Sequence, residues 1–316
     1  MTFFPRALAG TPATPGLPIE WEETNCLLCG GRRYKCLTEA PDVSATGQGL
    51  WFAVVQCQEC GLCFTNPRPS RAAMVQFYPP ETYPPHQARP ERAGRWFGGW
   101  NWLRGGTERK LLARVGQGRL LDFGCGGGSF LQRMDSQGWQ VTGLDISATT
   151  VCRVRADLGL RVLVGSLPHP ELQPESFDVI TMWQSLEHVH APRETLREAH
   201  TLLAKGGKLL VAVPNIDSLP YRWFGSDWYG LDLPRHLTHF TPMTLALMLE
   251  RAGFRVRSLR MVRHPKWLRW SAQHALQRKR GPYWHRWLTS RPAASAAAWY
   301  SYLSRQADCV LATVSK

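Results

Sequence analysis

A short glycine-rich run limits what this chain can fold into more than any other feature. The apolar residues LLDF at 120–123 lead into a turn with four glycines, GCGGG, and then into a helix-like stretch. Glycines at such a turn let the backbone approach a ligand closely, and the following helix offers free N–H groups. The next apolar run ends in Asp145, where folds of this kind grip ribose hydroxyls. The pattern predicts a nucleotide-type site, although glycine turns also occur for structural reasons alone.

The sequence around this turn alternates between strand-like and helix-like stretches. Apolar runs of strand length lie at 118–124, 139–146, 160–166, 177–185 and 206–215, with two more at 254–262 and 308–314. Helix-like stretches fall between them at 129–137, 149–157 and 194–203. We therefore predict an α/β fold with a Rossmann-like, doubly wound, mostly parallel seven-stranded sheet.

Two C-x-x-C-G units precede this region, Cys26/Cys29 and Cys57/Cys60. Two thiolates at this spacing can bind one metal ion from a tight turn, and two such turns complete a tetrahedral zinc site. Four thiolates leave no open coordination position, so we expect structural Zn²⁺ and not a catalytic ion. The alternative is that the pairs hold no metal and only pack.

These patterns divide the chain into segments. Residues 1–20 are expected to form a flexible arm, 21–70 a small zinc-ribbon-like module and 71–110 a proline-rich linker or lid. Residues 111–316 would form the α/β domain, with a basic, Trp-rich insertion at 263–305.

The glycine turn and its neighbours resemble the motifs of class I S-adenosylmethionine-dependent methyltransferases. The D-x-G-x-G-x-G pattern that starts at Asp122 is similar to their first motif, and FDVITMWQSLEHV at 177–189 is similar to their fourth-strand motif. LLAKGGKLLVAVPN at 202–215 is similar to the helix, turn and fifth strand that follow. The resemblance implies methyl transfer from S-adenosylmethionine.

The resemblance also implies roles for individual residues. Asp122, Gly124, Gly126 and Gly128 would hold the methionine half, and Asp145 the ribose. The adenine would lie between Ile146 and the pair Ser166 and Leu167, and Trp183 and Gln184 would line the sulfonium side. Many relatives have Asp in place of Ser166, and Trp183 could equally be a core residue.

The cysteine pairs, followed by CGLCFTNPRPS and YPPETYPPH, resemble bacterial methyltransferases of sugar and cell-envelope polysaccharide biosynthesis. This resemblance implies His188 and His236 as catalytic residues and a small-molecule or glycan acceptor, nucleotide- or lipid-linked. Leu233 and Arg235 stand where sugar C-methyltransferases have Tyr and Glu, a departure that favours O-methylation. Arg235 and Arg222 could instead grip a phosphate or carboxylate. Glu187 and His188 are also similar to a divalent-metal motif of quinone-biosynthesis O-methyltransferases.

Positive charge is concentrated late in the chain. The net charge is +14, and residues 263–291 carry eight Lys and Arg and no Asp or Glu, which leaves 14 − 8 = +6 for the rest. Tryptophans among these basic residues suit a solvated lid, an anionic membrane surface or, less well, nucleic acid. The N-terminus lacks a signal-peptide pattern, so we expect a cytoplasmic protein that could lie against the inner membrane face.

Two rival functions remain open at this point. A zinc module, basic charge and this type of core also occur in rRNA and tRNA methyltransferases. However, WQSL at 183–186 stands where base-methylating enzymes have N-P-P-Y. The second rival is a non-catalytic scaffold that only binds the cofactor.

Overall fold

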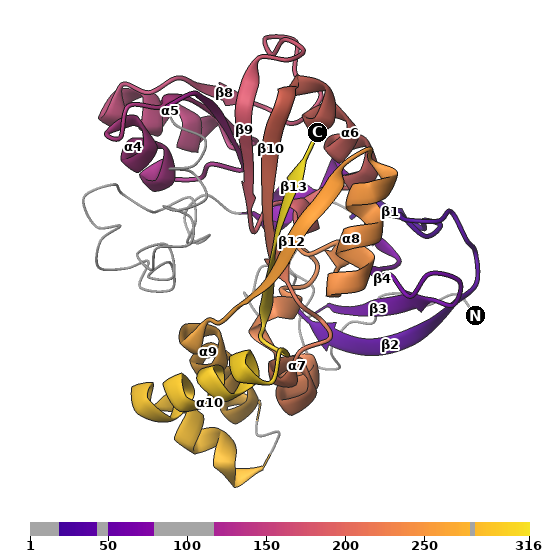
Figure 1. The fold of residues 1–316 in the computed structure, drawn as a ribbon. Coiled ribbons are helices and arrows are strands. Elements are labelled where there is room, and N and C mark those ends of the chain that lie inside the picture. Colours follow the sequence, from indigo (N-terminus) through magenta and orange to yellow (C-terminus); the bar gives the residue numbers. More distant parts are fainter. Residues whose placement is uncertain (1–18, 43–49, 79–116, 279–281) are drawn as a thin grey trace.

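The computed structural model describes residues 19–42, 50–78, 117–278 and 282–316, and its centre is a seven-stranded sheet (Figure 1). The strand order is β12-β13-β10-β9-β6-β7-β8. These strands are β6 (Arg119–Phe123), β7 (Gln140–Asp145), β8 (Val162–Val164), β9 (Phe177–Trp183), β10 (Leu203–Pro214), β12 (Arg255–Val262) and β13 (Cys309–Ser315). Six strands run in the same direction, and β13 lies antiparallel between β10 and β12. The predicted Rossmann-like, mostly parallel sheet is confirmed.

Helices cover both faces of this sheet, as its apolar strands require. One face carries α4 (Ser129–Asp135) and α5 (Ala148–Leu158), and the other carries α6 (Pro192–Leu202) and α8 (Pro242–Arg251) (Figure 1). Local signals set the helix ends: the Ser147 side chain caps α5 and Gly159 ends it, while Thr241 and Thr244 form a capping box at α8.

A second, smaller sheet is built mainly from the cysteine-bearing N-terminal region. Its order is β11-β4-β3-β2, with β2 (Tyr34–Pro41), β3 (Trp51–Cys57), β4 (Cys63–Thr65) and β11 (Thr238–His239). β1 (Trp21–Glu22) pairs separately with β5 (Arg68–Pro69), and the 3-10 helix η1 (Ala73–Phe77) follows. β11 comes from the loop after β10, so the N-terminal sheet is completed by a later part of the chain.

The predicted domain boundaries stay predictions. The arm falls almost entirely outside the described residues, and so does the linker or lid from residue 79 onward. Within the described part, apolar side chains of the cysteine loops, Leu28 and Leu62, share one buried cluster with Leu196 of α6 and Leu249 of α8. The N-terminal region therefore packs directly on the α/β core.

The connections at the carboxyl ends of the parallel strands are helical. After β9 comes the 3-10 helix η3 (Leu186–His188), and after β10 come α7 (Leu219–Phe224), η4 (Gly225–Asp227) and η5 (Tyr229–Leu231). The predicted insertion between β12 and β13 forms α9 (Pro265–Gln277), η6 (Tyr283–Thr289) and α10 (Arg291–Leu303). α7, α9 and α10 lie together at this end of the sheet (Figure 1).

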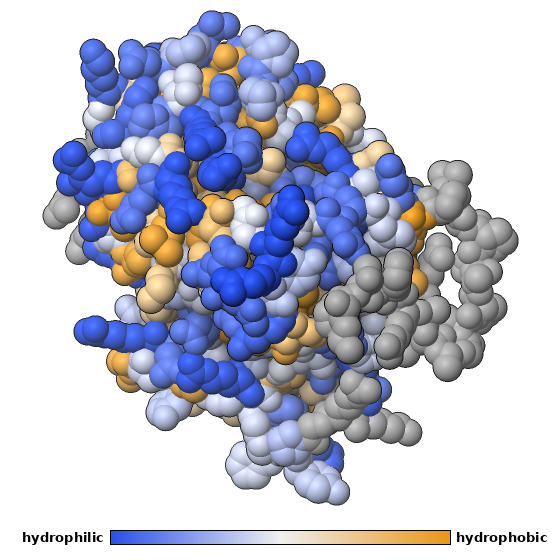
Figure 2. All heavy atoms as spheres, turned by 90° about the vertical axis from the view of Figure 1, so that its right-hand side faces the viewer, coloured by the Kyte–Doolittle hydropathy of each residue, from blue (hydrophilic) through white to orange (hydrophobic). Residues whose placement is uncertain are grey.

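The surface is mixed on the face that Figure 2 shows. Hydrophilic residues dominate it, with small hydrophobic patches scattered between them. Among the described residues, no helix combines the length and apolar character needed to cross a membrane.

Candidate active site and cysteine centre

The glycine turn after β6 has a backbone that only glycine adopts easily. Gly124, Gly126 and Gly128 all have positive φ, at 75°, 50° and 76°. A Cβ on Gly124 would lie 2.7 Å from the Ser185 Cβ, and one on Gly128 would lie 2.8 Å from a Val154 methyl. The turn therefore packs closely against the end of β9 and against α5, which keeps its backbone open to a ligand.

Asp145 connects the glycine turn after β6 to the turn after β7 through its carboxylate. Its carboxylate accepts hydrogen bonds of 2.9 Å from the backbone N–H groups of Gly126 and Ser147. Ile146, next in the chain, is 71% exposed, which is unusual for an isoleucine. A bound adenine ring would cover this side chain. Across this rim, Ser166 is half-buried and Leu167 is buried.

Asp122 lies beneath the glycine turn. It is 3% exposed and accepts a 2.7 Å hydrogen bond from the Thr181 hydroxyl. Burial, together with the nearby charge of Asp145, raises the pKa of Asp122 to about 7. Its role toward the methionine half stays a prediction.

The end of β9 carries a strained residue and buried polar atoms that lack partners. Gln184 has φ 49°, which is costly for a non-glycine residue and common at functional sites. Its amide donates to the Cys309 sulfur at 3.3 Å, while its Oε1 and the Ser185 hydroxyl are buried with no partner among the described residues. Trp183 is buried with its ring edge-on to Phe130. Unsatisfied polar atoms beside a glycine turn fit a polar ligand such as S-adenosylmethionine.

His188 and His236 come together although they follow different strands. Their ring centroids are 4.6 Å apart, and the planes of the two rings are nearly perpendicular to each other. The Nδ1 of His188 lies 3.1 Å from the Arg235 carbonyl, and the Nδ1 of His236 lies 2.9 Å from the Gly230 carbonyl. A carbonyl can only accept, so each Nδ1 carries the proton and each Nε2 carries the lone pair.

The environment of the two histidines keeps them neutral. Burial lowers the pKa of His188 to about 3 and that of His236 to about 4. Glu187 is fully buried, neither of its carboxylate oxygens makes a hydrogen bond within the described residues, and burial raises its pKa to about 8. One of these oxygens lies 3.9 Å from the His236 Nε2. Glu187, His188 and His236 offer three ligand atoms within 4.8 Å, so the divalent-metal interpretation stays a prediction.

Asp232 supplies the permanent negative charge of this cluster. Its carboxylate lies 3.9 Å from the His236 Nε2 and accepts hydrogen bonds from Arg235. Burial alone would raise the pKa of Asp232, but the charge of Arg235 outweighs burial and lowers it to about 2. A protonated His236 would therefore face a fixed carboxylate.

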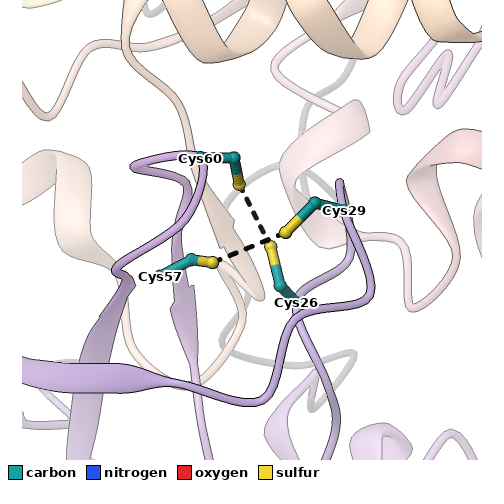
Figure 3. A group of neighbouring side chains, drawn as sticks. All are labelled: Cys26, Cys29, Cys57 and Cys60. Atoms are coloured by element: carbon teal, nitrogen blue, oxygen red, sulfur yellow. Dashed lines mark hydrogen bonds between the residues drawn. The ribbon is translucent and has the colours of Figure 1, made fainter.

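The four predicted cysteine ligands form one cluster (Figure 3). Cys26 and Cys29 come from the first C-x-x-C turn and Cys57 and Cys60 from the second, with Sγ–Sγ distances of 3.4 Å for Cys26–Cys60 and 3.6 Å for Cys29–Cys57. A tetrahedral Zn–S bond of about 2.3 Å requires neighbouring sulfurs about 3.8 Å apart, so the donor set fits zinc. Burial raises the pKa of Cys26, and that of Cys60 to about 11, so a metal would have to displace protons here.

The two turns repeat the same backbone design. Gly30 and Gly61 both have φ 77°, and their N–H groups donate to the carbonyls of Cys26 and Cys57 at 2.8 and 3.0 Å. The Arg251 guanidinium of α8 donates to the Leu28 carbonyl at 2.8 Å and so fixes the first turn to the α/β core.

A comparison with known proteins identifies the family. Residues 101–259, half of the chain, match the methyltransferase-domain family. The chain belongs to this family. It is an S-adenosylmethionine-dependent methyltransferase.

Curated relatives include the ubiquinone biosynthesis O-methyltransferase of Aeromonas salmonicida, 31% identical over 153 residues that cover 45% of this chain and 64% of that protein. The protein of the same name from Bordetella pertussis is 31% identical, over 51% of this chain and 71% of its own. Among solved structures, an S-adenosylmethionine-dependent methyltransferase from Mesorhizobium loti is 21% identical with a TM-score of 0.48, over 69% of this chain and 99% of its own.

One prediction about the methyltransferase's acceptor site is wrong. Arg235 cannot grip an acceptor phosphate, because it is fully buried and pairs with Asp42 at 2.9 Å and Asp232 at 2.7 Å. Arg222 pairs with Asp217 at 2.7 Å on the surface. The guanidinium of Arg235 serves to hold the histidine loop in place.

Sequence reasoning missed two contributors to the histidine cluster. The Tyr78 hydroxyl lies 2.9 Å from the His188 Nδ1, and so it accepts from that N–H. The Thr65 hydroxyl donates to the His236 carbonyl at 2.7 Å and accepts from the His239 Nε2 at 3.1 Å. Tyr78 is the first residue of YPPETYPPH, a stretch that was used only for the resemblance to sugar and polysaccharide methyltransferases. Thr65 follows the second cysteine turn.

Proposed function

We propose that the methyltransferase moves the methyl group of S-adenosylmethionine to a hydroxyl oxygen of a small-molecule acceptor, with a sugar or glycan precursor as the expected class. The observation that carries this proposal is the histidine pair at the carboxyl ends of β9 and β10, with His236 buried and His188 half-buried, each with Nδ1 bound to a backbone carbonyl. A neutral imidazole with a fixed tautomer is suited to take a proton from a hydroxyl.

Each residue of the site would have a defined task. S-adenosylmethionine supplies an electrophilic methyl group when it is bound at the glycine turn. The His188 Nε2 accepts the hydroxyl proton as the new O–CH₃ bond forms and the S–CH₃ bond breaks. Asp232 stabilises positive charge that develops on the pair, 3.9 Å from His236. Burial of Glu187 and His236 beside it limits the water around this transfer.

Two lines of support favour an oxygen acceptor. The relatives at 31% identity carry the name O-methyltransferase. The Tyr and Glu of sugar C-methyltransferases are replaced here by Leu233 and Arg235, both fully buried. Support for a sugar is limited to the resemblance of the cysteine-bearing N-terminal region.

We further propose that the cysteine cluster binds structural Zn²⁺. All four sulfurs come from two matching turns and converge on one point (Figure 3). Full thiolate coordination leaves no position for an acceptor.

The first test is cofactor binding followed by turnover. Calorimetry should detect S-adenosylmethionine binding to the wild type and weaker binding to Asp145→Ala. His188→Ala should keep the cofactor affinity and lose roughly 10²–10⁴-fold in methyl transfer. His200→Ala, whose ring packs edge-on against Phe254 outside the histidine cluster, is the matched control and should keep both. An unchanged rate for His188→Ala would remove it as the base.

The acceptor class is tested with a panel of hydroxyl compounds. Nucleotide-linked sugars, free sugars and phenols are offered in parallel, and product mass identifies the methylated atom type. Methylation of phenols alone would overturn the sugar class and keep the O-methyl transfer. Methylation of carbon, or of RNA alone, would overturn the proposal.

A further inference from the structure

We propose that the helical insertion of α9, η6 and α10 is a docking surface for an anionic phospholipid bilayer. The inference concerns binding only and does not depend on the identity of the acceptor. It rests on exposed aromatic side chains, on an unbalanced positive charge and on the position of the insertion next to the histidine loop.

The insertion exposes large apolar side chains to an unusual extent. Tyr283 is 89% exposed and Trp287 is 75% exposed on η6, and Leu303 is 73% exposed at the end of α10. The other large hydrophobic side chains that are exposed in the described part of this region are Trp270, Leu276, Trp284, Trp299, Tyr300 and Tyr302. Single exposed apolar residues are ordinary, but a concentration of them on one element marks an interaction surface.

These side chains adjoin one another across neighbouring elements. The Trp223 ring of α7 stacks on Tyr300 of α10 with centroids 6.5 Å apart, and it meets Trp284 of η6 edge-on at 6.4 Å. On the same helix as Tyr300, Trp299 lies 5.7 Å from Tyr302. The aromatic rings therefore form patches that span α7, η6 and α10.

The side of the insertion that faces the protein core is already packed with apolar side chains. The exposed aromatic rings lie outside this packing and are therefore not core residues. Its inward positions, Leu268, Ala272, Ala275, Leu288, Ala294 and Ala298, pack into the cluster that contains Phe224 and Trp228. α10 thus turns small alanines inward and bulky aromatic residues outward. A helix on the surface of a soluble protein has the reverse arrangement.

The positive charge of the insertion favours an anionic partner. Residues 263–307 hold nine Lys and Arg and no Asp or Glu. Some of these cations have partners within the protein, since Arg278 pairs with Asp227 and Arg269 donates to the Thr289 carbonyl. Arg286 and Arg291 are exposed next to the aromatic residues. Basic residues near an anionic membrane surface strengthen binding to it.

A bilayer fits this combination better than the other occupants do. A second copy of the chain would bring two strongly positive surfaces together, which charge repulsion opposes. RNA would use the cations and some rings, but it offers nothing to the aliphatic Leu276 and Leu303. Tyr, Trp and Leu beside Lys and Arg match the composition of protein surfaces at the membrane–water boundary.

The insertion touches the loop that carries His236. The Tyr229 ring lies 4.6 Å from Trp270 and 5.7 Å from Trp267, and the Tyr229 N–H donates to the Ser271 hydroxyl at 2.9 Å. Gly230, the next residue, provides the carbonyl that holds His236. A bilayer on this surface would therefore lie beside the acceptor side of the site.

The test is co-sedimentation of the full chain with lipid vesicles. We expect binding to vesicles that contain phosphatidylglycerol, weak binding to pure phosphatidylcholine, and loss of binding at high salt. Arg286→Glu/Arg291→Glu and Tyr283→Ala/Trp287→Ala should each weaken binding by about tenfold or more. Both pairs are exposed, so cofactor affinity and Tm should stay as in the wild type.

A matched charge control separates a local surface from general attraction. Arg161→Glu/Arg197→Glu makes the same change of net charge at exposed positions near β8 and on α6. It should keep most of the vesicle binding. Equal loss in this control, equal binding to neutral vesicles, tighter retention on RNA than on anionic vesicles, or self-association that Trp287→Ala abolishes would each overturn the proposal.

Discussion

Each histidine of the cluster is oriented by defined contacts of its ring nitrogens, two of them at the His188 Nδ1. His188 and His236 bind backbone carbonyls through Nδ1, and His239 donates through Nε2 to Thr65. Fixed tautomers matter because a base must present its lone pair and not its proton. The motifs allowed His188 and His236 to be predicted, but the tautomers depend on carbonyls of Arg235 and Gly230 that no sequence pattern marks.

Burial of His239 predicts a pH-dependent stability. Desolvation lowers its folded pKa to about 3, below the ordinary value of 6.5. The unfolded chain therefore gains a proton first as the pH falls, and stability that is complete above pH 6.5 declines toward pH 3, by up to about 1.4 kcal/mol per unit. His239→Gln removes this titration and can still donate to Thr65. Its Tm should fall less than that of the wild type between pH 6.5 and 4.5; parallel Tm curves would contradict the assignment.

At the scale of elements, the pairing of β11 with β4 joins the cysteine centre to the histidine cluster. β4 begins three residues after Cys60, and its Thr65 binds both the backbone of His236 and the side chain of His239. The strand that follows the second cysteine turn thus contacts the histidine loop directly. We expect a disturbance of the cysteine turns to reach the histidine loop through this strand.

Thr65→Val tests this connection. Valine has the same shape but removes the hydroxyl, which leaves the His239 Nε2 and part of the His236 carbonyl unsatisfied. We expect a loss of about 1–3 kcal/mol in unfolding free energy and a lower kcat, with cofactor affinity unchanged. The control is Thr313→Val, because the Thr313 hydroxyl is buried without a partner among the described residues and its removal should be neutral or stabilising. Equal effects of the two variants would show that Thr65 has no special role.

Local pattern explains which elements could be predicted. The seven strands of the large sheet and the helices α4, α5 and α6 each carry an apolar period or a turn signal of their own. β11 has two residues, and its partner strand lies more than 170 positions earlier, so no local signal marks it. The cysteine spacing predicted that four thiols would meet, but not that α8 would hold them through Arg251.

At the scale of the whole molecule, one apolar core runs from the cysteine turns into the large sheet. Leu28 and Leu62 share it with Leu121 and Ile180 of β6 and β9. The stability of the N-terminal region and that of the α/β fold should therefore be coupled, and the two are expected to unfold in one transition.

Metal removal tests this coupling. If the proposed zinc is present, elemental analysis should find one Zn per chain. Strong chelation or Cys26→Ser should lower the unfolding free energy by at least about 2 kcal/mol and reduce turnover. Cys36→Ser, an exposed cysteine of the same sheet outside the cluster, should change neither. A metal-free protein as stable as Cys36→Ser would overturn the zinc proposal.

The small sheet is completed by β11, a strand from late in the chain, and this has a consequence for folding during translation. The ribosome releases β2, β3 and β4 early, yet their partner β11 emerges only after most of the large sheet has been made. Until then, the hydrogen-bonding edge of β4 stays open on the nascent chain. A metal ion captured by the cysteine turns would hold that edge in shape during translation, so the cell's zinc supply would affect the yield of folded protein as well as its final stability.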